Sequence, residues 1–166
     1  DARILRTQGE LEESRAALRA LLDAHPDFER GWITLLEWLE AEHRHEEILA
    51  IAEQVPAALT DSAVLHVYAA DAHFARDDSV AAESALRSAL AADPSHAWAK
   101  HRLATHLLAN RRAAAALELL GDDDPRALPA WQAALVARAA AACGKTELAG
   151  RGFRRLLQHA EVDPTL

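Results

Sequence analysis

The sequence predicts an all-α protein, a right-handed α-solenoid of stacked antiparallel helical hairpins, and three observations support this fold class. Hydrophobic residues, mainly the helix formers alanine and leucine, make up 51% of the 166 residues, and aromatic residues only 5%. Six glycines and six prolines are too few for a β fold, which needs many turns. The pairs His25-Pro26 and Asp93-Pro94 lie 68 residues apart, twice a period of 34, and similar segments lead into both.

These segments each start with a polar turn, continue as a helix with small or apolar residues three and four apart, and close on a proline. The two that match best are GELEESRAALRALLDAHP (9–26) and DDSVAAESALRSALAADP (77–94). The segment 144–164 repeats the pattern with two additional residues, 111–125 is a shortened version, and 43–61 is a divergent one. We therefore expect each segment to form the second helix of a hairpin.

Amphipathic partner helices precede these segments. They are FERGWITLLEWLEAE, DSAVLHVYAADAHFA, SHAWAKHRLATHLLA and PAWQAALVARAAAAC. Turns of two to five residues make successive helices antiparallel, so about ten helices form hairpins, and stacking buries the apolar face that a single hairpin leaves open. Asp61, Asp93 and Ser95 are the expected N-cap residues.

The period of 34 and its small residues resemble the tetratricopeptide repeat (TPR) family, in the bacterial type rich in alanine and arginine. The resemblance implies one solenoid domain over 1–166, with a partial repeat over 1–28 and full repeats over 29–62, 63–96, 97–129 and 130–164. Position 8, small in the family, holds Leu36, Ala70, Ala104 and Ala137, and position 20 holds Ile48, Ala82, Ala116 and Ala149. Alanine at these positions lets the two helices of a hairpin pack tightly.

Two departures from the family pattern have structural consequences. Leu36 and Ile48 are too large for their positions, so we expect the first full hairpin to be splayed or compensated by the small Ala52. The second helix of the third repeat should end early at Gly121.

Several residues that suggest chemistry are better explained structurally. His96, His101 and His106 are five residues apart, which rotates each by about 140° from the last, so they point in different directions and form no metal site. The sequence His-Arg-His (43–45) lacks the further ligands that zinc needs. Cys143 has no evident catalytic base and is predicted to be a small packed residue, and Gly-Lys-Thr (144–146) lacks the earlier glycine of a phosphate loop. We expect no catalytic residue, no cofactor and no metal.

The TPR resemblance places ligand contacts on the first helix of each repeat, which lines the concave surface. The candidate partner-binding residues are Tyr68, Asp71, Phe74, Trp98, His101, Arg102, Thr105, Trp131 and Arg138; Val67 and Leu135 occupy further contact positions. Trp98 and Trp131 are equivalent in their repeats and could anchor a peptide or helix, or could instead pack between hairpins. Ile33 and Glu37 replace the Lys/Asn clamp of TPRs that bind acidic C-terminal tails, and only Arg102 fits a clamp position. Because Glu37 would repel a carboxylate, we do not expect an acidic C-terminal tail as the ligand.

The resulting functional hypothesis is a protein–protein interaction scaffold that binds a peptide or helix in the groove, and the alternative is the non-catalytic TPR arm of a larger transferase or hydroxylase. A net charge of −8 without a basic stretch longer than a pair disfavours nucleic acid as a ligand, and no apolar run is long enough to insert in a membrane.

A single cysteine fits a cytoplasmic location, and a periplasmic one remains open. The absence of methionine and the ending EVDPTL suggest a piece of a longer chain, whose uncapped solenoid ends could self-associate. The full open reading frame would separate the two hypotheses.

Overall fold

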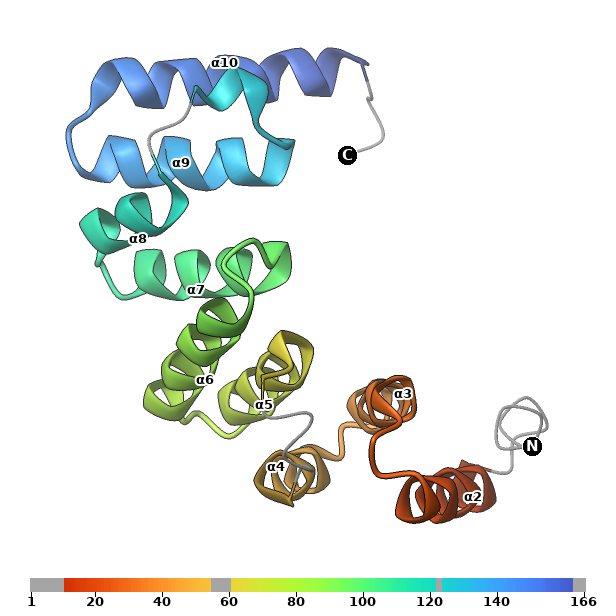
Figure 1. Ribbon diagram of the computed structural model, residues 1–166. Helices are drawn as coiled ribbons and strands as arrows, with labels where there is room; N and C mark the ends of the chain where they lie inside the picture. Colours follow the sequence, from red (N-terminus) through yellow and green to blue (C-terminus); the bar gives the residue numbers. More distant parts are fainter. Residues whose placement is uncertain (1–10, 55–60, 122–123, 163–166) are drawn as a thin grey trace. The chain divides into compact units, whose positions relative to one another are not determined.

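A computed structural model of the chain describes residues 11–54, 61–121 and 124–162 (Figure 1). Within these ranges the regular structure is entirely helical, which confirms the predicted fold class. The α-helices are α2 (Leu11–Ala24), α3 (Glu29–Ala41), α4 (His45–Gln54), α5 (Ala63–Ala75), α6 (Ser79–Ala92), α7 (Ala97–Ala109), α8 (Ala113–Leu120), α9 (Ala130–Ala142) and α10 (Thr146–Val162), and a 3-10 helix, η2, spans Pro125–Ala127.

The chain divides into two compact units, an N-terminal unit over Asp1–Pro94 and a C-terminal unit over Ser95–Leu166. The two differ in charge, because residues 1–94 carry 19 acidic and eight basic side chains, whereas residues 95–166 carry seven acidic and ten basic ones. The N-terminal unit is therefore strongly acidic and the C-terminal unit mildly basic. A single solenoid over 1–166 stays a prediction.

Among the described residues, the same turn occurs four times, after α3, α5, α7 and α9. These first helices begin at Glu29, Ala63, Ala97 and Ala130, the residues at which the full repeats were expected to begin. Each turn contains one residue with positive φ, and these residues are His43 (56°), Asp77 (59°), Arg111 (59°) and Gly144 (74°). The next residue then donates its backbone N–H to a carbonyl in the last turn of the helix, in the bonds Arg44 to Leu39, Asp78 to His73, Arg112 to Leu107 and Lys145 to Ala140. This is the Schellman closure of a helix, repeated at intervals of 33 or 34 residues.

Large aliphatic side chains fill the core of the N-terminal unit. Leu36 and Ile48 are both fully buried, although the corresponding family positions are small. The helices α3 and α4 approach each other closely over a shorter length than α5 and α6 do, and Ala52 packs against the same core. Both observations agree with a first hairpin that is splayed by its large residues and compensated by a small one.

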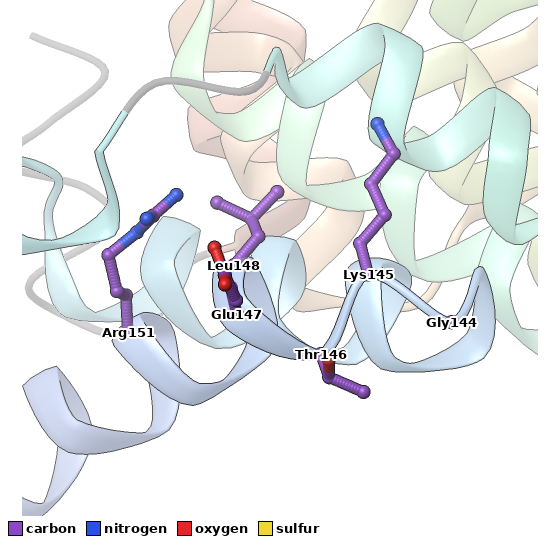
Figure 2. A pocket seen from close by; sticks show the side chains of 6 residues that line it. All are labelled: Gly144, Lys145, Thr146, Glu147, Leu148 and Arg151. Atoms are coloured by element: carbon purple, nitrogen blue, oxygen red, sulfur yellow. The ribbon is translucent and has the colours of Figure 1, made fainter.

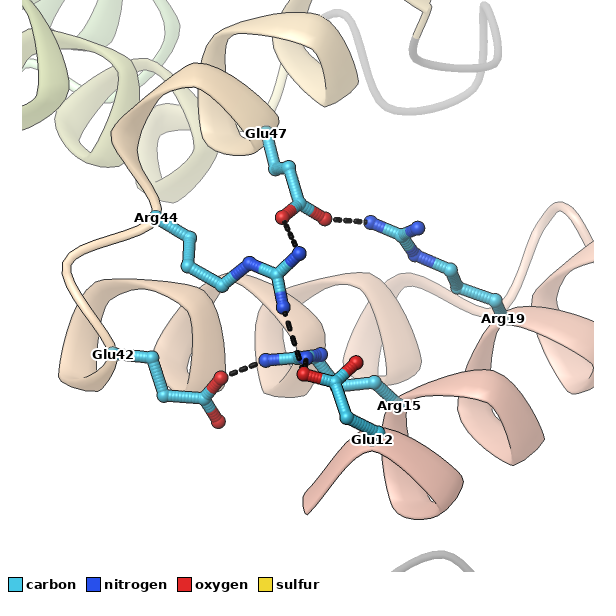
Figure 3. A network of polar contacts seen from close by, with 6 residues as sticks. All are labelled: Glu12, Arg15, Arg19, Glu42, Arg44 and Glu47. Carbon is cyan, nitrogen blue, oxygen red and sulfur yellow. Dashed lines mark hydrogen bonds and ion pairs between the residues drawn. The ribbon is translucent and has the colours of Figure 1, made fainter.

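A network of charged side chains joins α2, the end of α3 and α4 (Figure 3). Arg15 is buried, and its guanidinium makes ion pairs with Glu12 and Glu42. Arg44 bridges Glu12, with 3.3 Å between Nη1 and Oε1, and Glu47, which also pairs with Arg19 at 2.5 Å. The hydrogen bond from Arg15 holds the pKa of Glu12 below its usual value, despite some desolvation. Sequence reasoning did not find this network, because its members come from three helices.

Small residues set the spacing between α9 and α10 in the C-terminal unit. A Cβ atom added to Gly152 on α10 would lie 2.7 Å from the Cβ of Ala137 and 3.0 Å from the carbonyl oxygen of Ala133, both on α9. The two helices therefore pack nearly backbone to backbone. The helix α8 ends at Leu120 before Gly121, as expected, and η2 follows with Asp124 as its N-cap.

Some local predictions were wrong. The N-cap of α5 is Ser62 rather than Asp61, and Asp93 is the C-cap of α6 because its N–H still bonds to Ala89. The N-cap of α7 is His96 rather than Ser95, and its Nδ1 accepts a hydrogen bond of 3.2 Å from the N–H of Ala99. Cys143 is exposed rather than packed, because it is the C-cap residue that enters the turn after α9.

Candidate partner-binding site

Three aromatic rings from two helices contact one another in the C-terminal unit. Trp98 and His101 lie three residues apart on α7 and so share one side of that helix. Their ring centroids are 5.5 Å apart at an interplanar angle of 26°, and His101 also meets Trp131 of α9 edge to face, with centroids 5.5 Å apart. Trp98 is 52% exposed and Trp131 is half-buried. The indole of Trp98 therefore lies at the surface, with its ring stacked on the imidazole of His101.

Polar side chains extend this aromatic cluster along both helices. Thr105 lies one turn beyond His101 on α7, and Arg138 lies two turns beyond Trp131 on α9, so each continues the side of its helix that carries the cluster. The Nδ1 atom of His101 and the Oγ1 atom of Thr105 are buried, and neither has a hydrogen-bond partner among the described residues. Arg138 is exposed. We call this surface the aromatic–basic face, and its residues are Trp98, His101, Arg102, Thr105, Trp131 and Arg138.

The other three candidate residues lie on α5 in the N-terminal unit. Tyr68 is partly buried against the core of that unit, and Asp71 and Phe74 are half-buried. Burial raises the pKa of the Tyr68 phenol, and the nearby carboxylates of Glu37, Glu40 and Asp71 raise it further, whereas Arg30 lowers it. Tyr68 thus lies in an acidic environment, unlike the aromatic–basic face.

Two other contact positions carried over from the family were wrong. Val67 and Leu135 are 5% and 3% exposed and belong to the core. Both lie on helix sides that face neighbouring helices rather than solvent, which a position number alone does not reveal.

An open hollow lies at the start of α10, where the sequence Gly-Lys-Thr occurs (Figure 2). The side chains of Lys145 and Arg151 flank it, with Glu147 and Leu148 between them. Gly144 has a φ of 74° and makes the turn after α9, as the sequence indicated. A helix therefore precedes this segment, whereas a phosphate loop follows a strand.

No cluster of three or more histidine, cysteine, aspartate or glutamate residues suited to a metal ion occurs in the described parts of the chain. The rings of His43, in the turn after α3, and His45, the first residue of α4, have centroids 5.9 Å apart and are tilted relative to each other. Among the helices of these same parts, none is both long and apolar enough to cross a membrane.

The fold is that of a TPR-like helical-repeat protein, and comparison with known proteins supports this class. One solved structure, "Crystal structure of MamA protein", is 20% identical with a TM-score of 0.72, over 96% of this chain and 88% of that one. Another, "Crystal structure of MamA", is 19% identical with a TM-score of 0.75, over 99% of this chain and 97% of that one. No family model and no curated protein matches the sequence. At this level of identity the similarity establishes the fold alone.

Proposed function

We propose that the protein is a non-enzymatic scaffold that binds a peptide or helix of a partner protein on the first helices of its repeats. The observation that carries this proposal is the half-exposed indole of Trp98, which is supported by His101 and Trp131. Exposed tryptophans held in a fixed orientation, with arginine nearby, are typical of the residues that dominate binding energy at protein interfaces. The TPR-like fold agrees with this role.

The geometry of the cluster favours binding over catalysis. His101 and Thr105 lie one turn apart, but neither the buried Nδ1 nor the buried Oγ1 makes a hydrogen bond to a described residue. A hydroxyl nucleophile needs a base within hydrogen-bonding distance, and Thr105 lacks one there.

Selection of peptides from a display library on the full chain tests this proposal. The variant with both Trp98→Ala and Trp131→Ala should lose most binding of the selected peptides, while Val80→Ala should retain it. Val80 is a suitable control because it is 83% exposed but lies on α6, a second helix of its repeat. Circular dichroism of each variant checks folding. Selected peptides that bind the double variant as well as the parent chain would contradict the proposal.

A further inference from the structure

We infer that the groove between α2 and α4 is a second docking surface, which binds a partner segment that carries an arginine or lysine next to a large apolar residue. This inference goes beyond the proposed function, because the groove belongs to the N-terminal unit and its walls are second helices of the repeats. Three features of that unit support it, namely an apolar floor, walls that are held in place, and an excess of negative charge at the rim.

The floor of the groove is apolar. The cavity has a volume of about 380 Å³, and its lining includes Leu22 of α2, Trp32 and Leu35 of α3, and Ile51 of α4. The three aliphatic side chains are buried, so they lie at the bottom of the groove. A concave site of this size with an apolar lining accommodates a large side chain such as leucine or phenylalanine.

The walls of the groove are held in place without a ligand. Arg19 on α2 and Glu47 on α4 both line the groove, and their ion pair of 2.5 Å joins the two walls (Figure 3). The Nε1 atom of Trp32 donates a hydrogen bond of 3.0 Å to the carbonyl oxygen of Pro26, which restricts the indole. A site that is ordered in advance loses little conformational entropy on binding.

The charge at the rim of the groove is negative. Residues 11–54 contain 11 acidic and four basic side chains. Arg19 is the basic residue of the lining, and Glu47 already neutralises it, whereas the exposed Asp23 makes no ion pair with any described residue. A cationic side chain is therefore attracted to Asp23, and an acidic one is repelled.

The shape of arginine and lysine side chains also suits the groove. Their aliphatic stems can lie along the apolar floor while the charged end stays at the rim beside Asp23. The half-buried ring of Trp32 attracts a cation through its π-system. Gln54 is exposed in the lining and offers an amide donor and acceptor to a peptide backbone. Because apolar, cationic and amide contacts lie side by side, the groove fits a protein segment better than a free cation.

The test is the binding of labelled synthetic peptides to the full chain, measured by fluorescence anisotropy. The peptide has one arginine next to one leucine among alanine and serine residues, and both of its ends are blocked. It should bind at least about tenfold more tightly than the same peptide with glutamate in place of arginine. N-acetylarginine amide has the cation without the apolar neighbour and should compete only weakly.

A matched pair of charge reversals locates the cation. Asp23→Lys should weaken binding of the arginine peptide about tenfold and strengthen binding of the glutamate peptide, while Glu13→Lys should change either affinity less than about twofold. Glu13 is an exposed carboxylate of the same helix outside the lining, and both variants change the net charge equally. Unchanged thermal unfolding of the two variants shows that the loss does not come from misfolding.

A second pair of variants tests the apolar contact. Ala50 is an exposed residue of the lining, so Ala50→Phe should fill the groove and weaken the arginine peptide at least about tenfold. Ala16 is exposed on α2 outside the lining, and Ala16→Phe should leave the affinity unchanged. Circular dichroism checks the folding of both variants.

Any of four results would overturn the inference. These are equal affinity for the arginine and glutamate peptides, equal effects within either pair of variants, binding of N-acetylarginine amide as tight as that of the peptide, and a self-association of the chain that Ala50→Phe abolishes. Failure of the proposed function is distinguishable, because the variant with both Trp98→Ala and Trp131→Ala should bind the arginine peptide as tightly as the parent chain does. Loss of the arginine peptide in that double variant would contradict the inference as well.

Discussion

The hairpin of α3 and α4 in the N-terminal unit and the hairpin of α9 and α10 in the C-terminal unit are built by different means. In the N-terminal unit large side chains separate α3 from α4, and a network of ion pairs around the buried Arg15 ties these helices to α2. In the C-terminal unit alanine and glycine let α9 and α10 pack almost in contact, with Gly152 at the closest approach. The turn after the first helix is nevertheless the same in both. The turn and the helix length thus define the repeat, while the spacing of its helices is set by individual residues.

The largest expected loss of stability comes from a substitution that breaks the ion-pair network. Glu42→Gln removes the partly buried partner of Arg15 and leaves a buried guanidinium with the exposed Glu12, so it should reduce the free energy of unfolding by about 3 kcal/mol. Chemical denaturation followed by circular dichroism measures this loss. Glu12→Gln is the control and should cost less, since that carboxylate is exposed. Equal losses for the two variants would mean that burial of Arg15 is not what makes the network important.

The next effect tests close packing in the C-terminal unit. Gly152→Ala places a methyl group against α9 and should destabilise by about 1–3 kcal/mol, because the nearest atoms include a backbone carbonyl that cannot move independently. Gly150→Ala on the same helix meets only the end of Arg154, at 3.9 Å, and should stabilise by up to about 1 kcal/mol through helix propensity. Thermal denaturation of both variants compares them. Stabilisation by both substitutions would refute close contact between α9 and α10.

A smaller change in stability is expected at the turn that follows the first helix of each repeat. Gly144→Ala should destabilise by about 1 kcal/mol, although its Cβ would meet no atom within 4 Å, because only the positive φ is unfavourable. The reverse change at the equivalent turn, Arg111→Gly, should stabilise by a similar amount. Denaturant midpoints measure both changes. The same sign for the two substitutions would show that the turns are not equivalent.

The smallest effect concerns the acidic environment of the N-terminal unit. Tyr68 is the single tyrosine, so ultraviolet absorbance reports its titration alone, and its pKa should lie above the usual value because of burial and nearby carboxylates. A raised pKa in the folded state means that the associated stability is present below the unfolded value and is lost as pH rises through the folded one. Glu40→Gln should move the pKa back towards normal, and Glu118→Gln, on α8 of the other unit, should not. An ordinary pKa in the parent chain would contradict this environment.

Much of the fold could be predicted because prolines and small residues recur along the sequence with the period of the repeat. The prolines and small residues placed the starts of the first helices at Glu29, Ala63, Ala97 and Ala130. Features decided by a single side chain were harder to predict. His96 replaces Ser95 as the N-cap of α7 because its imidazole reaches the N–H of Ala99, an unusual cap that propensities do not favour.

The candidate site was predictable only as a list of residues. The repeat positions of Trp98, His101 and Trp131 predicted that all three contact the ligand. That their rings also contact one another could not be predicted, because it depends on the packing of α9 against α7. The buried charge of Arg15 had no sequence signal, since its partner Glu42 is 27 residues away on another helix. The roles of the nine candidate residues stay predictions.

The central claim is that the C-terminal unit binds the partner through Trp98 and Trp131, and the indole N–H signals of the four tryptophans test it directly by nuclear magnetic resonance. Two tryptophans, Trp32 and Trp38, lie on α3 of the N-terminal unit and serve as internal controls. On addition of a peptide selected from the display library, the account predicts shifts of the Trp98 and Trp131 signals, with Trp32 and Trp38 unchanged. Shifts confined to Trp32 and Trp38, or of equal size in all four, would contradict it.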